Sequence, residues 1–185
     1  MDNGACSYRR FLDGDDEGFV EIIRIYKDGM ILYLCGITGN IYLAEDLTED
    51  TFVKIITKKP KFAGKSTFKT WLYAIARNVA LDYLRKNKGV VLVSTEDIHS
   101  LAGDMESLER AYIKEEEKIE LHRAMDNLIP DYRQVLWLVY FEGFTAKEVA
   151  DVMHKSLHSV ETLLYRAKRS LKAELEKGGF VYEGL

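Results

Sequence analysis

The chain has 185 residues, a formal net charge of −4, 47% apolar residues and only two prolines. This composition favours ordered, mainly helical structure in one domain or in two small ones. Its most apolar run, Met30 to Ile37, is far shorter than the roughly 20 residues of a membrane span, which excludes a transmembrane protein.

The beginning of the chain and its cysteines indicate where the protein works. Residues Met1 to Gly4 have neither the basic leader nor the apolar core of a secretion signal, so we expect a cytoplasmic protein without membrane insertion. Cys6 and Cys35 are isolated, and the four histidines do not cluster with them. We therefore expect ordinary thiols, no metal site and no cofactor.

Apolar residues at helical spacing predict helices from about Asp15 to Lys88. The pattern comprises Phe19, Ile22, Ile23, Tyr26, Met30 and Leu34, and then Leu43, Leu47, Thr51 and Ile55. Gly36 to Gly39 is predicted to separate two helices. Pro60 ends the second, because proline removes a donor and disfavours helix in the residue before it. Ser66 or Thr67 is predicted to cap the next helix.

The second of these helices carries acidic residues on adjacent turns. They are Glu45, Asp46, Glu49 and Asp50, beside an apolar face of Leu47, Thr51 and Ile55. Paired carboxylates can serve metal or acid–base chemistry, but no histidine, nucleophile arrangement or Gly-rich phosphate loop accompanies them. The protein is therefore not expected to be an enzyme. Two interpretations remain, a solvated helix face or a docking surface for a basic partner.

The third helix, from about Ser66 to Lys86, follows a basic loop. The segment from Lys58 to Lys88 has nine basic residues and one acid, Asp82; the basic residues are Lys58, Lys59, Lys61, Lys65, Lys69, Arg77, Arg85, Lys86 and Lys88. The periodicity assigns Phe68, Leu72, Ile75, Ala76, Val79 and Tyr83 to one side and leaves Lys69, Tyr73, Arg77 and Arg85 exposed. With Phe62 in the loop, such a surface suits single-stranded nucleic acid, because lysines neutralise phosphates and an aromatic ring stacks on a base.

The helical pattern is lost over the predicted linker, residues 89–114. Val90 to Val93 is a short β-prone run, and an acidic continuation follows with Glu106, Glu109 and Glu115 to Glu117. The negative charge of this segment would keep the linker away from DNA phosphates. The alternative is that these acids are the solvated face of a helix.

A second helical unit is predicted over residues 115–177, with a break at Pro130, a helix from Ala146 to Met153, a turn at His154 to Ser156 and a last helix from Leu157 to about Glu176. The last helix has one apolar stripe: Leu157, Val160, Leu164, Ala167 and Leu171. Its other face holds His158, Ser159, Glu161, Thr162, Tyr165, Arg166 and Arg169. This is the form of a helix-turn-helix that reads duplex DNA, although a small helical bundle has the same division.

Three motifs in one order resemble a bacterial RNA polymerase sigma factor of the extracytoplasmic-function (ECF) group of the sigma-70 family. Ala44 to Phe52 resembles the family's polymerase-binding region. A second motif resembles the family's −10 and strand-opening helix: Ser66 to Tyr73, Ile75 to Asn78 and Asp82 to Arg85. The third resembles its −35-binding domain: Leu128 to Val135, Glu148 to Ala150, Val160, Leu164 and Arg166 to Ala167.

The resemblance implies an all-α protein of two small helical domains joined by a flexible linker: residues 1–88 for polymerase and the −10 element, and 115–177 for the −35 element, with a flexible tail at 178–185. Implied partners are core RNA polymerase (the clamp helices of the largest subunit and the flap of the second largest), promoter DNA and an anti-sigma factor. The implied polymerase contacts are Glu45, Asp46, Glu49, Asp50 and Phe52. The implied −10 contacts are Lys58, Lys59, Lys61, Phe62, Lys65, Lys69, Tyr73, Arg77, Asn78 and Arg85. The implied −35 contacts are His158, Ser159, Thr162, Leu163, Arg166 and Arg169.

The chain departs from the family pattern at several positions. Ala74 stands where an arginine is common, and His154 stands at the usual glycine of the turn, a conformation that costs histidine free energy. Glu161 and Leu163 replace common basic residues, so fewer phosphate contacts are expected. Two interpretations remain: Glu161 accepts from a cytosine amino group and Leu163 meets a thymine methyl, or −35 binding is weak and specificity moves to the −10 region. The alternatives to a sigma factor are a free-standing helix-turn-helix regulator and a helical interaction protein without DNA contact.

Overall fold

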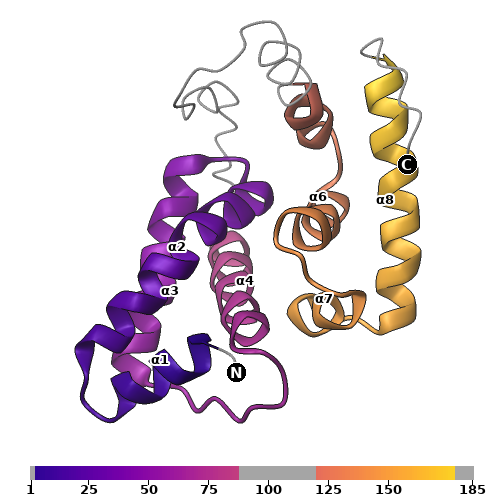
Figure 1. The fold of residues 1–185 in the computed structure, drawn as a ribbon. Helices are drawn as coiled ribbons and strands as arrows, with labels where there is room; N and C mark the ends of the chain where they lie inside the picture. Colours follow the sequence, from indigo (N-terminus) through magenta and orange to yellow (C-terminus); the bar gives the residue numbers. More distant parts are fainter. Residues whose placement is uncertain (1–2, 88–119, 178–185) are drawn as a thin grey trace, which may run out of the picture.

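The computed structural model describes residues 3–87 and 120–177 and is helical throughout, without a strand in those ranges (Figure 1). The first unit holds α1 (Asn3–Leu12), α2 (Asp16–Thr38), α3 (Ile41–Lys58) and α4 (Phe68–Lys86). The second holds a helix over residues 120–126, α6 (Pro130–Leu136), the π-helical segment η1 (Trp137–Phe141), α7 (Ala146–Met153) and α8 (Leu157–Lys177). The expected all-α fold with two helical units is confirmed. The predicted linker, its β-prone run at 90–93 and the tail at 178–185 lie outside the described residues.

Side-chain caps begin α2, α3 and α4. Asn40 Oδ1 accepts from the backbone N–H of Leu43 at 2.9 Å, and Thr67 Oγ1 accepts from that of Thr70 at 3.2 Å, so the cap predicted at Ser66 or Thr67 is Thr67. The separation predicted from Gly36 to Gly39 is confirmed only at Gly39, because α2 continues through Gly36 to Thr38. Gly39 ends it at φ 68°, a left-handed conformation that glycine adopts without steric cost.

An aromatic cluster joins α1, α4 and the loop between α3 and α4. Phe68 is fully buried, with ring centroids of Tyr8, Phe62 and Trp71 between 5.3 and 5.6 Å from its own. Tyr8 lies on α1, a helix that the sequence pattern did not predict. The cluster therefore fixes α1 and the basic loop against the first turn of α4.

The second unit has the predicted helix-turn-helix boundaries. Pro130 begins α6, and Thr145 forms a capping box with Glu148 at the start of α7. His154 ends α7 at φ 53°, as its place at the usual glycine of the turn implied. The π-helical segment at Trp137–Phe141 was not predicted, since wider turns of this kind leave no periodic signal.

The apolar stripe of α8 begins one turn later than the sequence predicts and extends to Leu175. Val160, Ala167 and Leu171 are buried, and Leu164 is half-buried against them. Leu157 is 45% exposed, so its assignment to the stripe is wrong. It is the first residue of α8, beyond the reach of the helices that cover the remaining positions.

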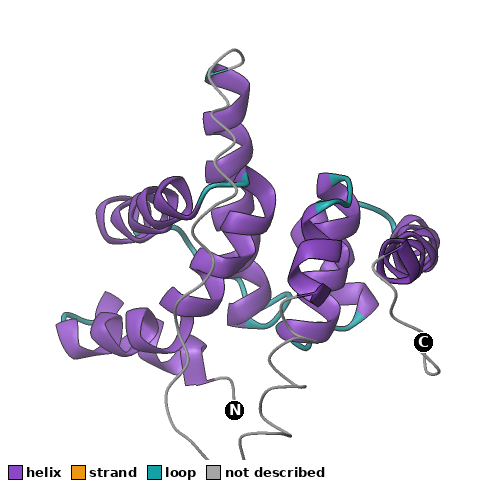
Figure 2. Ribbon diagram, turned by 90° about the horizontal axis from the view of Figure 1, so that it is seen from above, coloured by secondary structure: helices purple, strands orange, loops and turns teal. Residues whose placement is uncertain are grey.

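The two units pack against each other, with α7 on α4 and α6 on α2. Figure 1 shows α7 beside α4, and the two units lie side by side in both views (Figures 1 and 2). Their buried apolar side chains form one connected cluster that runs from Tyr8 to Leu175. The face of α4 that turns away from α2 and α3 therefore meets the second unit rather than solvent. Within the described ranges, no helix combines the length and the apolar character needed to cross a membrane.

Candidate functional site

The outer side of α3 carries the acidic residues that the sequence singled out. Glu45, Asp46, Glu49 and Asp50 are all exposed. Exposed apolar side chains flank them, namely Tyr42 (62% exposed), Val53 and Ile56. We call these seven residues the α3 face. Acidic and apolar groups on one rigid helix can dock a partner that is both basic and apolar.

Phe52, expected as a contact residue beside these acids, is buried at 6% exposure. Its ring packs edge-on against Phe19 of α2, with centroids 6.0 Å apart. The interpretation of Phe52 as a surface contact is wrong in this structure, because its side of α3 is needed to pack the helix onto α2. Phe52 holds the α3 face in position.

The basic loop after α3 is tied down on α1. Tyr8 Oη donates to the carbonyl oxygen of Pro60 at 2.7 Å, and Lys59 Nζ lies 4.8 Å from the ring centroid of Phe11. Lys59 itself has φ 42° and ends α3. The loop thus begins at a fixed point, with Lys58, Lys59, Lys61 and Lys65 all exposed.

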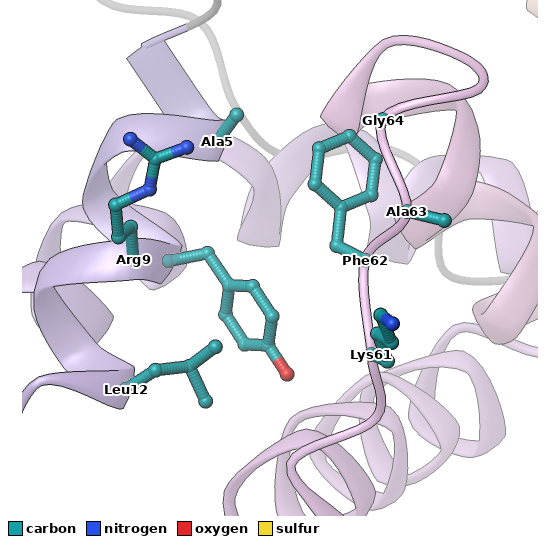
Figure 3. A pocket seen from close by; sticks show the side chains of 8 residues that line it. Ala5, Arg9, Leu12, Lys61, Phe62, Ala63 and Gly64 are labelled. Carbon is teal, nitrogen blue, oxygen red and sulfur yellow. The ribbon is translucent and has the colours of Figure 1, made fainter.

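A pocket of about 280 Å³ lies between α1 and this loop (Figure 3). It is lined by Ala5, Tyr8, Arg9, Leu12, Lys61, Phe62, Ala63 and Gly64. Figure 3 shows Ala5, Arg9 and Leu12 on the α1 side and Lys61 to Gly64 on the loop side. Aromatic and apolar walls with a cation from each side fit a flat aromatic ring that carries a phosphate.

Sequence reasoning found the loop side of this pocket and missed the α1 side. Tyr8, Arg9 and Leu12 were not among the candidate residues, because no helix was expected before Asp15. The available signal was the three-residue spacing of Tyr8 and Phe11, both of which are buried.

The predicted exposure of Tyr73 and Arg77 on α4 is wrong. Tyr73 is 1% exposed and Arg77 is 8% exposed. The second unit covers both, and the ring of Tyr73 also packs on Tyr33 of α2 with centroids 5.4 Å apart. Arg77 Nε donates to Gln134 Oε1 at 3.0 Å. The ring of Phe144 packs on Tyr73 with centroids 5.3 Å apart.

The two neighbouring candidates on α4 also contact the second unit. Lys69 Nζ lies 2.9 Å from Glu142 Oε2 and donates to the carbonyl oxygen of Glu142 at 2.7 Å. Asn78 Nδ2 lies 3.3 Å from His154 Nε2. Arg85, at the far end of the helix, stays exposed and pairs with Asp82.

Burial also shifts pKa values where α4 meets the second unit. It raises the pKa of the Tyr73 hydroxyl, and the nearby Glu142 carboxylate raises it further, so Tyr73 stays neutral. For Glu148 burial acts to raise the pKa, but hydrogen bonds from Thr145, Thr67 and Thr70 outweigh it and the pKa is lowered. Thr67 and Thr70 belong to the first unit and donate to Glu148 Oε1 of the second at 3.3 Å each.

The outer side of α8 presents most of the predicted duplex-reading residues. His158, Ser159, Arg166 and Arg169 are exposed, whereas Thr162 and Leu163 are half-buried. Leu163 packs partly on the core, which limits how far it can reach toward a base. Tyr165 is exposed beside Arg169, whose guanidinium lies 5.9 Å from its ring centroid. Among the described residues, no three His, Cys, Asp or Glu side chains gather as a metal site.

Both halves of the chain match models of known protein families. A family model described as Sigma-70 region 2 matches residues 22–90, and one described as Sigma-70, region 4 matches residues 118–171. The fold is similar to the sigma factor RpoE solved with the anti-sigma factor NepR from Bartonella quintana, at TM-score 0.68 and 22% identity over 85% of this chain and 96% of that one. It is also similar to CnrH solved with the cytosolic domain of CnrY, at TM-score 0.64 and 20% identity over 95% and 96%.

Curated relatives span nearly the whole chain. The ECF RNA polymerase sigma factor SigM of Bacillus subtilis is 32% identical over 158 residues, which are 85% of this chain and 95% of SigM. The RNA polymerase sigma-H factor of Pseudomonas aeruginosa is 28% identical over 171 residues, or 88% and 89%. The chain therefore belongs to the ECF RNA polymerase sigma factors.

Proposed function

We propose that this sigma factor docks on core RNA polymerase through the α3 face and directs initiation at a distinct set of promoters. The observation that carries the proposal is the exposed row of four carboxylates with apolar neighbours on a helix fixed from behind by Phe52. The clamp helices of the largest polymerase subunit are the proposed partner of this face. The protein acts in the cytoplasm as a binding factor, without catalysis of its own.

The pocket between α1 and the basic loop is proposed to receive one unstacked base of the melted non-template strand. Phe62 supplies a ring for stacking, and Arg9 and Lys61 are placed for the adjoining phosphates. Further phosphates of the strand are proposed to contact the basic side chains of Lys58, Lys59, Lys65 and Arg85. The −10 element is therefore read as single-stranded DNA.

The exposed side of α8 is proposed to enter the major groove at the −35 element. His158, Ser159 and Thr162 lie near its beginning, where a recognition helix approaches base edges, and Arg166 and Arg169 are suited to the phosphates. Because Leu163 is partly committed to the core, we propose that α8 contributes less sequence specificity than the −10 site. The flap of the second largest polymerase subunit is the proposed partner that holds this unit near the DNA.

An anti-sigma factor is a further proposed partner. RpoE and CnrH share this fold; RpoE was solved with the anti-sigma factor NepR, and CnrH with the cytosolic domain of CnrY. A free-standing regulator would instead bind duplex DNA tightly without polymerase. The net charge of −4 argues for weak DNA binding by this chain alone.

The purified chain is expected to associate with core RNA polymerase and to program initiation at promoters that the housekeeping factor does not use. Gel filtration with core enzyme and mapping of transcript starts after overexpression measure the two properties. Tight duplex binding by the chain alone, combined with no association with core enzyme, would identify the free-standing regulator instead.

Removing the two cations of the pocket, in the double variant Arg9→Ala/Lys61→Ala, is expected to impair promoter opening. Without the phosphate contacts of Arg9 and Lys61 the base should leave the pocket and lose its stacking, which contributes about 1–3 kcal/mol, so open-complex formation should fall roughly 5- to 150-fold. Permanganate reactivity of thymines at the mapped promoter measures the opened strand.

The double variant Arg24→Ala/Lys27→Ala is the matched control for this test, because both side chains are exposed on α2, away from the pocket. It removes the same charge and should leave opening within about twofold of wild type. Equal losses in the two double variants would show that net charge matters and the pocket does not.

A further inference from the structure

The basic loop between α3 and α4 has no regular structure that could hold one wall of the pocket in shape. In the described part of the chain, no backbone–backbone hydrogen bond involves residues 61–66. Gly64 lies within this stretch at a left-handed φ of 68°. A loop without such bonds loses conformational entropy when it orders around a ligand. Its shape therefore depends on side chains that reach it from the helices.

Helix α1 supports the beginning of the loop. The Tyr8 hydroxyl donates to the carbonyl oxygen of Pro60 at 2.7 Å. Tyr8 is 1% exposed, and its ring centroid lies 5.3 Å from that of Trp71 on α4. Burial raises the pKa of the Tyr8 hydroxyl, so the group stays protonated and remains a donor. The hydroxyl thus fixes the point at which the chain leaves α3 for the pocket.

The anchored carbonyl stands directly before the two loop residues that the proposed function uses. Lys61 and Phe62 follow Pro60, and Figure 3 shows them across the pocket from Arg9 and Leu12 of α1. Consecutive Cα atoms are only about 3.8 Å apart, so a displacement at Pro60 passes to both residues. The distance between the α1 wall and the stacking ring therefore depends on the bond from Tyr8.

Helix α1 is in turn fixed on α2. Ser7 Oγ donates to Glu21 Oε2 at 2.7 Å, and Arg10 Nη1 donates to Glu21 Oε1 at 2.9 Å. The two helices approach closely at Gly18, where an added β-carbon would lie 2.3 Å from the carbonyl oxygen of Ser7. Such a distance is too short for any side chain, so α1 keeps its place only with glycine at position 18.

We propose that α1 is the positioning element of the −10 pocket, and that the hydrogen bond from Tyr8 to Pro60 holds the basic loop ready to receive a base. Tyr8 is a positioning residue, because its ring is buried and it acts through the loop. This inference rests on the proposed function, since it explains how the same pocket keeps its shape. A pocket that is ordered before the strand arrives binds the base without a further loss of loop entropy.

The variant Tyr8→Phe tests the positioning role, because it removes the hydroxyl and keeps the ring. Loss of this buried donor should lower open-complex formation by the polymerase holoenzyme about tenfold, measured by permanganate reactivity at the mapped promoter. Tyr140→Phe is the matched control, since Tyr140 is 50% exposed in the second unit and does not line the pocket. It should open the promoter as wild type does, and both variants should keep the wild-type affinity for core polymerase.

Promoters with one abasic nucleotide in the non-template strand distinguish positioning from a general loss of stability. At the position whose base enters the pocket, the abasic nucleotide should lower opening by wild type about tenfold. Tyr8→Phe should open that promoter as well as wild type does, because no base remains to be positioned. At every other abasic position its tenfold deficit should persist.

Gly18→Ala provides a second variant, because it displaces α1 without changing a side chain that lines the pocket. It should reproduce the pattern of Tyr8→Phe on intact and abasic promoters. Gly36→Ala in the same helix is its control, since the added β-carbon meets only Arg133 Cδ, at an ordinary 3.9 Å. This control should match wild type on every promoter.

The proposal is overturned if Tyr8→Phe opens the intact promoter as fast as wild type. It is also overturned if the deficit of Tyr8→Phe is equal on the intact promoter and on all abasic ones, because the hydroxyl would then support only the fold. A wild type that tolerates an abasic nucleotide at every position would refute the base pocket of the proposed function, and the positioning role with it.

Discussion

Replacing both Asp46 and Glu49 by lysine is expected to abolish binding to core RNA polymerase. The two carboxylates lie one turn apart in the middle of the α3 face, and neither supports the fold through a buried contact. The double substitution changes the local charge by four units, so attraction to a basic partner becomes repulsion. Charge pairs at protein interfaces couple by about 1.5–7 kcal/mol each, which corresponds to a loss of affinity of at least a hundredfold for two. Fluorescence anisotropy of the labelled chain with core enzyme measures it.

The double variant Asp28→Lys/Glu176→Lys controls for the change in net charge. Both residues are exposed, one on α2 and one near the end of α8, and both lie off the α3 face. Its affinity for core enzyme should stay within a few-fold of wild type, and helical circular dichroism should be unchanged in both double variants. Retained binding by Asp46→Lys/Glu49→Lys would mean that these carboxylates are only a solvated helix face.

Truncation of Phe68 is expected to cause a large loss of stability. Phe68 is fully buried where α1, α4 and the basic loop meet, and its ring contacts those of Tyr8, Phe62 and Trp71. Phe68→Ala removes that burial and leaves a cavity, which costs about 3–5 kcal/mol of the free energy of unfolding. Urea denaturation followed by circular dichroism gives the value.

A matched aromatic deletion on the surface is Tyr165→Ala, since Tyr165 is exposed on α8. It should change the free energy of unfolding by no more than about 0.5 kcal/mol. A loss below about 1 kcal/mol for Phe68→Ala would show that the aromatic cluster does not organise the first unit. In that case the pocket beside α1 would also lack the support assigned to it.

Local patterns in the sequence determined the helices of both units other than α1 and the π-helical segment. Pro60, Thr67, Pro130, Thr145 and His154 act within one turn of their own position, so the start or end of each helix follows from a cap, a missing donor or a left-handed residue. The exposed acids of α3 and the exposed arginines of α8 were likewise predicted from periodicity. Their faces remain uncovered, so nothing distant in the chain alters the outcome.

Only the tertiary structure decided which of the predicted surfaces are free. Periodicity divides a helix into an apolar and a polar side, but it does not tell whether a segment about 60 residues away will cover the polar side. Tyr73 and Arg77 lie on such a side and are buried because Phe144 and Gln134 pack there. The α1 wall of the pocket is a second case, since Tyr8 and Arg9 acquire their role only when Phe68 brings α1 to the loop. Burial of a polar group depends on partners that are distant in sequence, and for this reason local pattern alone could not supply it.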